Sequence, residues 1–249
     1  MHALAIHALR LGDDALILGQ RLGEWCGHAP ALEIDLSLAN IALDCVGQAT
    51  HFLALAGEIE GQGRDADRLA FHRDVMDFTN CLLVEQPNGD FAQTIARQFF
   101  FAHYQHLLFE RMASVTDARF AAIAAKAVKE TAYHAKLASE WVIRLGDGTD
   151  ESRARMERGL DWMWRFTGEI FVMDEIDSAA IEAGAGVDKA ALRPLWDARI
   201  GAALAEAALA PPAPHRPVLG GRTGRHSEHL GHLLSDMQFL QRAYPGATW

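Results

Sequence analysis

The sequence predicts an all-α protein in which long helices run up and down a bundle. Three observations lead to this fold class. Apolar residues recur at steps of three and four nearly throughout, as residues 8, 11, 15, 18, 22 and 25 illustrate. No segment alternates apolar and polar residues consistently, as a half-buried strand would. Clusters of Gly, Pro, Asn and Asp interrupt the helical spacing, which is typical of turns between helices.

Four long helices are predicted in the first part of the chain, and turn or capping signals mark most of their ends. "GHAP" ends the first helix, "EGQGRD" ends the second, and "RLGDGTD" ends the fourth. Asp90 and Asp117 are expected to be the N-caps of the third and fourth helices. We expect these four helices, with one or two short helices within residues 65–84, to cover about residues 4–145. The second is expected over about 33–60, and the third is expected to reach about residue 113.

Further helices are predicted over about residues 150–243, with a less regular apolar pattern. "AGAG" at residues 183–186 interrupts this pattern, and another helix is expected over about residues 188–208. The longest loop, residues 211–225, is rich in Pro and Gly. Ser227 is expected to cap a last helix that ends before Pro245. Two hairpins of long helices, followed by more helices, indicate one ferritin-like up-down domain over residues 1–249.

Composition excludes several classes of function. The chain has 249 residues, of which 50% are hydrophobic, and a formal net charge of -10. Nucleic-acid phosphates require a basic face, so nucleic acid is not expected as the main partner. The three cysteines lie far apart and form no C-x-x-C pair, which favours reduced thiols in a cytoplasmic protein. We expect no signal peptide and no membrane span.

The stretch "KETAYHAK" raises the question of metal binding. Glu130 and His134 fall on the same helical stripe as apolar residues, where an unpaired polar group would be costly. A carboxylate-bridged di-iron site in a bundle takes a Glu from each of two helices and a Glu-x-x-His pair from each of the other two. No Glu or Asp in the chain has a His three residues later, and Tyr133 takes that place after Glu130.

Each long helix nevertheless carries a polar residue near its middle. We therefore predict a polar core cluster that is similar in layout to a metal site but holds no metal and has no catalytic residue. Its predicted members are Gln20, Asp44, Gln48, Gln98, Glu130 and His134. Glutamine brings no charge and is a poor iron ligand, so the cluster lacks the negative charge that two ferrous ions require.

Two segments suggest contact with other molecules. "DWMWRFTGEIF" holds more large apolar side chains than one helix face can bury, so Trp162 and Trp164 are candidate interface residues. "GGRTGR" places Arg222 and Arg225 in a Gly-rich loop. Such a loop either cradles a phosphate or docks against another protein, and docking is favoured because no strand precedes it as in a P-loop. Arg222 and Arg225 are therefore candidate interface residues too.

Three long stretches resemble a known family. They are "LRLGDDALILGQRLGEWCGHAPALEIDLSLANIALDCVGQA", "LLVEQPNGDFAQTIARQFF" and "HSEHLGHLLSDMQFLQRAYPG", and they are similar to the PaaC subunits of bacterial phenylacetyl-CoA ring epoxidases. The resemblance covers essentially the whole chain. It implies a ferritin-like fold and a place in the multicomponent oxygenase of aerobic phenylacetate breakdown.

The resemblance also implies partners and cofactors. In that family a related subunit, PaaA, holds the di-iron centre, a small PaaB subunit bridges the complex, and the reductase PaaE supplies electrons from NADPH through FAD and an iron–sulfur cluster. For this chain the resemblance implies a non-catalytic partner of PaaA without a cofactor of its own, and a homodimer when alone. No catalytic residue of the family is carried over, because Gln, Gly and Tyr stand at the matching positions.

Two other functions stay open at this point. One is an active di-metal oxygenase with atypical ligands. It would need Glu24, Asp44, Glu130, His134 and His103 to converge. The other is a metal-free helical protein that binds an acyl-CoA, with the arginines of residues 222–225 on its phosphates.

Overall fold

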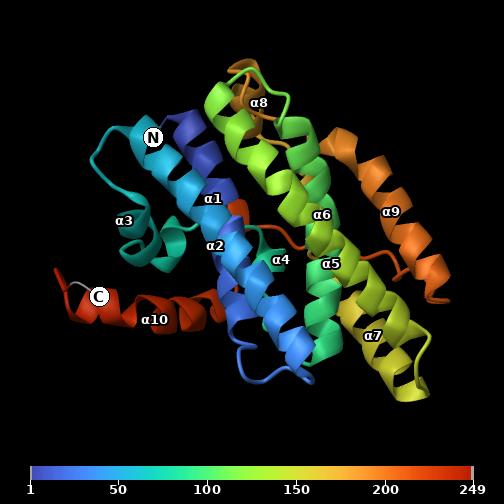
Figure 1. Ribbon diagram of the computed structural model, residues 1–249. Coiled ribbons are helices and arrows are strands. Elements are labelled where there is room, and N and C mark those ends of the chain that lie inside the picture. Colours follow the sequence, from blue (N-terminus) through green and yellow to red (C-terminus); the bar gives the residue numbers. More distant parts are fainter. Residues whose placement is uncertain (1, 248–249) are drawn as a thin grey trace. The chain divides into compact units, whose positions relative to one another are not determined.

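The computed structural model describes residues 2–247, and within them it contains helices, turns and loops but no strand (Figure 1). The prediction of an all-α, ferritin-like protein with additional C-terminal helices is confirmed. The chain forms two compact units. Unit 1 comprises Met1–Gln86 and Gly220–Trp249, and unit 2 comprises Pro87–Leu219. The expectation of a single domain over residues 1–249 stays a prediction.

Unit 1 is built on an antiparallel pair of long helices, α1 (Ala3–Gly23) and α2 (Leu32–Glu60). Gly12 of α1 faces Leu53 of α2, and Gly19 faces Cys45, so the two helices run in opposite directions. The unit also contains α3 (Ala66–Phe71), η1 (Val75–Asp77), α4 (Leu82–Glu85), η4 (Gly221–Thr223) and α10 (Glu228–Ala243). The last two return to this unit after the chain has passed through unit 2.

Unit 2 is built on a second antiparallel pair, α5 (Phe91–Met112) and α6 (Ala118–Gly146). The contacts Phe91–Trp141 near one end and His106–Thr131 near the other show the antiparallel direction. The unit continues through α7 (Asp150–Trp164), η2 (Glu169–Phe171), α8 (Glu175–Glu182), η3 (Ala190–Leu192) and α9 (Arg193–Glu206). Helices α6, α7 and α9 all pack on α5.

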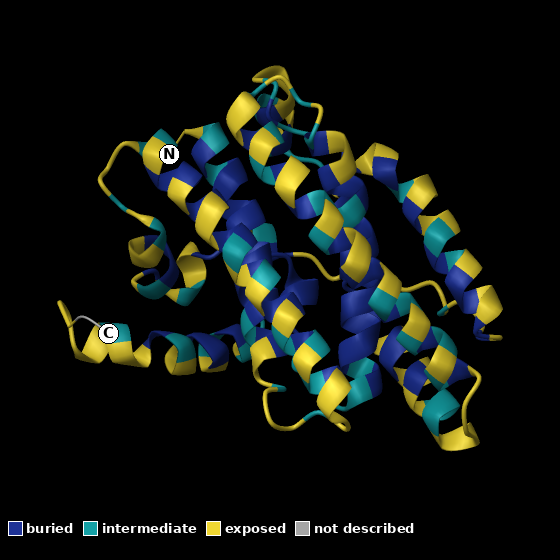
Figure 2. Ribbon diagram, in the orientation of Figure 1, coloured by how far each residue is buried: buried dark blue, intermediate teal, exposed yellow. Residues whose placement is uncertain are grey.

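Burial differs between the helices of each pair (Figure 2). About three quarters of the residues of α1 and α5 are buried (16 of 21 and 17 of 22), whereas α2 and α6 alternate buried and exposed residues along their lengths. Helix α5 can be buried on all sides because its apolar residues surround the helix, including the run Phe99–Phe101. Helix α1 buries charged residues together with apolar ones, which requires partners for those charges.

Most helix ends lie where the sequence predicts them. The Asp90 carboxylate accepts a hydrogen bond from the Gln93 N–H, and Asp117 accepts one from the Arg119 N–H, so both predicted N-caps are confirmed. Ser227 occupies the predicted N-cap position of α10, but its side chain makes no capping bond. The helix expected over about residues 188–208 begins instead as the short helix η3 and continues as α9, with Pro194 in the first turn of α9.

The buried stripe of α6 is rotated from the one that the sequence suggests. Glu130 is half-buried, whereas His134 is fully buried. The buried side chains of α6 are those of Phe120, Ala124, Ala127, Thr131, His134, Ala135, Ala138 and Val142. Small alanines pack close to α5, so the side of α6 that faces the core follows the alanines rather than the larger apolar residues.

Helix α2 is long and apolar enough to cross a membrane by length and composition, judged on its most apolar 18-residue window. Half of that window is buried inside the protein, and α2 packs along α1. A core helix of a soluble protein has the same properties, so α2 is weak evidence for a membrane span.

The close approach of Gly57 to the turn after α2 gives a test of this packing. A Cβ at position 57 would collide with the backbone carbonyl of Arg64, whereas one at Gly47 on the same helix would meet nothing within 4 Å. We expect Gly57→Ala to lower the free energy of unfolding by about 1–3 kcal/mol through overpacking. We expect Gly47→Ala to be neutral or to raise it by up to ~1 kcal/mol. Urea unfolding of both variants checks this, and equal effects would contradict it.

Candidate functional site

The six residues of the predicted polar core cluster are divided between the two units. Gln20 of α1 and Asp44 of α2 are half-buried, and Gln48 of α2 is buried. These three belong to unit 1. The existence of one cluster that includes all six residues stays a prediction.

The other three members belong to unit 2, and Gln98 on α5 is the most unusual of them. Its side chain is 1% exposed, yet neither Oε1 nor Nε2 has a hydrogen-bond partner among the described residues. His134 on α6 is fully buried, and Glu130 is half-buried. A buried carboxamide without hydrogen-bond partners is costly in free energy.

The geometry does not assemble a metal centre within residues 2–247. No three His, Cys, Asp or Glu side chains of that range are placed so that they could hold one metal ion. At the position where a Glu-x-x-His pair would need its imidazole, Tyr133 is 44% exposed.

His103 and His106 of α5 form hydrogen bonds with residues of α6. The Nε2 of His103 lies 2.8 Å from the Ser139 Oγ, and the Nδ1 of His106 lies 3.3 Å from the Thr131 Oγ1. Burial, together with the charge of Arg199, lowers the pKa of His103 to about 4, so this imidazole is neutral at pH 7. Burial also lowers the pKa of His106, against the opposing effect of Glu110.

Unit 1 contains a buried charge network that was not predicted from the sequence. Asp13 of α1 is fully buried, and its carboxylate forms a bidentate ion pair with the guanidinium of Arg73. The same carboxylate accepts the backbone N–H of Thr79 at 2.8 Å and the Thr79 hydroxyl at 2.9 Å. These bonds join the middle of α1 to the segment that connects α3 and α4.

Asp14, the next residue, binds the returning end of the chain. Arg222 donates to both carboxylate oxygens, from Nη1 at 3.0 Å and from Nη2 at 2.7 Å. The Cys81 N–H donates to Asp14 Oδ1 at 2.7 Å. Arg222 also donates to the Thr79 carbonyl at 3.0 Å. The Gly-rich loop is therefore ordered within unit 1, where a Cβ on Gly221 would collide with the backbone of residue 80.

Glu85 is the third carboxylate of this network, and it is also fully buried. His226 Nδ1 lies 2.7 Å from Glu85 Oε2, and the Ser227 N–H donates to Oε1 at 2.7 Å. The other ring nitrogen of His226 lies 2.9 Å from the Phe78 carbonyl oxygen. Both ring nitrogens face acceptors, so this site favours the doubly protonated, positively charged form of the imidazole.

The sequence signal for this network is the pair of adjacent aspartates in "RLGDDALIL". Two carboxylates inside an otherwise apolar helix require cations or backbone donors. Their partners lie 60 residues away at Arg73 and 208 residues away at Arg222. No local pattern identifies such partners. We term the carboxylates of Asp13, Asp14 and Glu85, with Arg73, Arg222 and His226, the α1 charge network.

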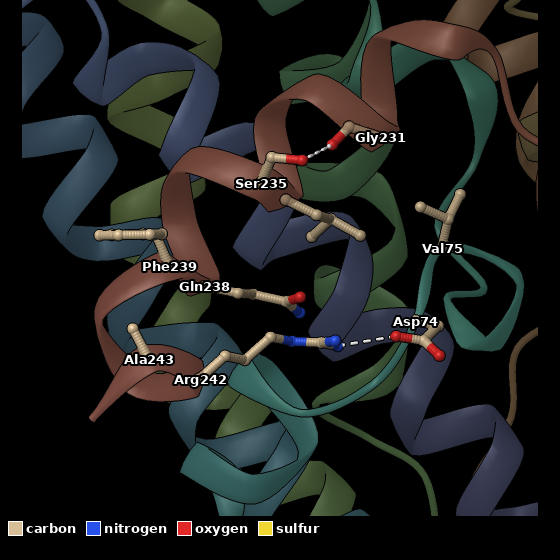
Figure 3. Close-up of a pocket in the computed structure, with 9 residues that line it drawn as sticks. Asp74, Val75, Gly231, Ser235, Gln238, Phe239, Arg242 and Ala243 are labelled. Carbon is tan, nitrogen blue, oxygen red and sulfur yellow. Dashed lines mark hydrogen bonds and ion pairs between the residues drawn. The ribbon is translucent and has the colours of Figure 1, made fainter. Parts of the chain in front are cut away.

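A groove of about 530 Å³ lies beside this network, between α10 and residues 74–75 (Figure 3). Its polar side chains are already engaged. Arg242 lies 2.9 Å from Asp74 and donates to the Arg73 carbonyl at 2.8 Å, while Gln238 donates to the Ala70 and Arg73 carbonyls. The groove therefore fixes α10 to the preceding segment and presents no uncommitted catalytic group.

The candidate interface residues lie in different settings. Trp162 is 40% exposed, and Trp164 stacks on Trp196 with 5.6 Å between ring centroids. Arg222 is committed to Asp14, with its side chain 11% exposed, and Arg225 is exposed. Their participation in an interface stays a prediction.

An exposed apolar face on α2 was not foreseen from the sequence. Four large apolar side chains lie on one side of this helix at steps of four, seven and three residues. They are Leu32, Leu36, Leu43 and Val46, with exposed fractions of 71%, 56%, 69% and 36%. We term them the α2 apolar face. Aligned exposed leucines on a long helix mark a surface for contact with another molecule.

The fold and these sites define a ferritin-like helical protein whose buried carboxylates are balanced by arginine and histidine. Comparison with known proteins gives the family. The family described as phenylacetic acid catabolic protein matches residues 1–249, and the chain belongs to this family. The C-type subunit of the 1,2-phenylacetyl-CoA epoxidase of Escherichia coli strain K12 is 52% identical over 249 residues, which is 100% of both chains. The resemblance seen in the sequence is confirmed.

The charged state of His226 predicts a pH dependence of stability. Burial alone would lower the pKa of His226, but its hydrogen bond to Glu85 and the charges of Glu85 and Asp13 raise it above 6.5. The stabilisation from the His226–Glu85 pair is therefore complete below pH 6.5 and is lost as the pH rises through the folded-state pKa of His226. We expect the difference in free energy of unfolding between the wild type and His226→Gln to shrink between about pH 6 and pH 9.

Urea unfolding at several pH values measures this difference. His232→Gln is the matched control, because His232 is exposed on the same helix. A difference that stays constant over this range, or one of equal size for His232→Gln, would refute the prediction.

Proposed function

We propose that this chain is a non-catalytic structural subunit of a multicomponent 1,2-phenylacetyl-CoA epoxidase in aerobic phenylacetate degradation. It pairs with the homologous di-iron catalytic subunit and stabilises it. Three findings support this proposal: the family, the relative that is a C-type subunit of such an epoxidase, and the α2 apolar face. The α2 apolar face is the observation on which the pairing rests, because it exposes several leucines on one helix.

The partner chemistry follows from the shape of this face. A straight helix with aligned leucines buries them best against a helix of another bundle, where ridges of one fit the grooves of the other. A homologous ferritin-like chain offers such helices. Stable subunit interfaces are typically apolar, as this face is. We therefore assign the α2 apolar face as the surface that binds the catalytic subunit.

The arrangement of charge supports a non-catalytic role. The carboxylates most deeply buried in unit 1, those of Asp13 and Glu85, are bound by Arg73 and by His226. In a di-iron site the charge of the carboxylates is balanced by the metal ions, whereas here arginine and imidazolium balance the charge of these buried carboxylates. The chain also has no Glu-x-x-His pair.

The remaining parts of the complex are proposed on the same basis. The catalytic partner is of the PaaA type, a small PaaB-type subunit bridges the complex, and a PaaE-type reductase with FAD and an iron–sulfur cluster takes electrons from NADPH. The chain itself uses no cofactor, acts in the cytoplasm, and forms a homodimer when its partner is absent.

The α2 apolar face gives a direct test of pairing. Leu43→Glu places a charge in the centre of this face, and we expect the Kd for the catalytic subunit to rise at least tenfold, which is about 1.4 kcal/mol. Because Leu43 is 69% exposed, the free energy of unfolding should change little. Co-purification and interferometry measure the binding.

Leu195→Glu is the control, since Leu195 is 44% exposed on α9 in unit 2. It should bind like the wild type. Unchanged binding by Leu43→Glu would exclude the α2 apolar face as the pairing surface.

Metal content tests the non-catalytic role separately. We expect the chain, purified after growth with added iron, to hold far less than one iron atom per molecule, because its charge network is already neutralised. It should form no epoxide without the catalytic subunit. Elemental analysis and product assays decide this. Two tightly held iron atoms per chain would instead establish an active di-metal protein with atypical ligands.

A further inference from the structure

Unit 2 contains a cavity of about 310 Å³ that none of the functions above uses. Three segments of the chain form it: the end of α7 with the turn that follows, the first turn of α9, and the extended residues 212–217. We term the last segment the proline strap. The cavity is lined by both polar and apolar groups, and its polar side chains include Arg165, Arg193 and His215.

Two contacts of the proline strap itself and one of the adjacent Val218 hold it in place at the cavity. The Val218 N–H donates to the Arg165 carbonyl at 3.0 Å, and His215 Nε2 lies 3.0 Å from Asp161 Oδ1. Pro217 packs so closely on Gly168 that a Cβ there would lie 2.7 Å from the proline ring. The cavity is therefore formed before any ligand binds, which is typical of small-molecule sites.

The aromatic side of the cavity is rigid as well. Trp164 lines it and stacks on the fully buried Trp196, whose Nε1 donates to the Phe100 carbonyl at 2.9 Å. The guanidinium of Arg193 lies 5.2 Å from the ring centroid of Trp196. These contacts fix both a planar ring and a cation at the cavity wall.

The charges around the cavity are balanced except at one residue. Arg193 donates from Nε to Asp197 at 2.7 Å, and His215 is paired with Asp161. Neither aspartate lines the cavity. Arg165 has no ion pair among residues 2–247; its guanidinium lies over the Trp162 ring at 4.4 Å, and its buried Nε has no hydrogen-bond partner there. Arg165 therefore brings a guanidinium charge without a carboxylate partner to the cavity lining, and such a charge attracts an anion.

We propose that this cavity binds a phosphate-bearing ligand. Arg165 donates to the phosphate oxygens as the principal contact, because guanidinium matches phosphate in geometry and charge. Arg193 lines the same cavity and provides a second cation. Trp164 offers a ring against which a planar group attached to the phosphate can pack. The proposal does not depend on the function proposed above.

Calorimetric titration of the full-length chain at low salt tests this, with inorganic pyrophosphate and ADP as probes. We expect binding of at least one probe, and a Kd at least tenfold higher for Arg165→Met. Arg216→Met is the matched control, because Arg216 is an exposed arginine of the same strap that does not line the cavity. It should bind like the wild type, and Arg165→Lys should bind with intermediate affinity.

The two probes distinguish the source of the phosphate. Equal affinities indicate a site for simple phosphates. Tighter ADP binding that Trp164→Leu abolishes indicates a nucleotide-like ligand. The proposal fails if neither probe binds the wild type, or if Arg165→Met and Arg216→Met bind equally.

A second measurement needs no variant and so covers the case in which Arg165→Met does not fold. Phenylglyoxal modifies accessible arginines, and mass spectrometry locates the modified residues. We expect pyrophosphate or ADP to protect Arg165 in the wild type and to leave Arg216 unprotected. Equal modification of Arg165 with and without the probes would overturn the proposal.

Discussion

The burial of two adjacent carboxylates in α1 constrains much of unit 1. Asp13 and Asp14 lie in a helix whose surroundings exclude water, and an ion left there without partners would be very unfavourable. Arg73 and Arg222 satisfy them, and both arginines must reach α1 from distant parts of the sequence. The position of the segment before α4 and the return of the chain to unit 1 after Leu219 follow from this requirement.

Buried ion pairs of this kind are weak sources of stability but strong determinants of which conformation is adopted. If the end of the chain packed elsewhere, the Arg222 guanidinium would lose its carboxylate partner, and the Asp14 carboxylate would lose its guanidinium partner. The pairing of Glu85 with His226 adds a second fixed point close by along the chain. The end of the chain is thus held to one place by charge and by directional hydrogen bonds, with apolar packing of α10 added to them.

The same network bears on the question of metal chemistry. A helical bundle that buries several carboxylates has two ways to neutralise them, with metal ions or with basic side chains. In unit 1 of this chain the cations are guanidinium and imidazolium, each in hydrogen-bond contact with its carboxylate. This arrangement is consistent with a chain that keeps the architecture of an oxygenase subunit and uses its buried charge for structure. The exposed leucines of α2 are then the surface that we propose for contact with another subunit.

The sequence by itself determined the helical fold class, the boundaries of the long helices and the N-caps at Asp90 and Asp117, because each depends on residues within one or two turns of each other. It also determined the family, through long stretches of similar sequence. Only the tertiary structure decided the partners of Asp13, Asp14 and Glu85, the rotation of α6 and the position of the proline strap beside Arg165. These features join residues up to 208 positions apart, and such pairings depend on how whole helices pack.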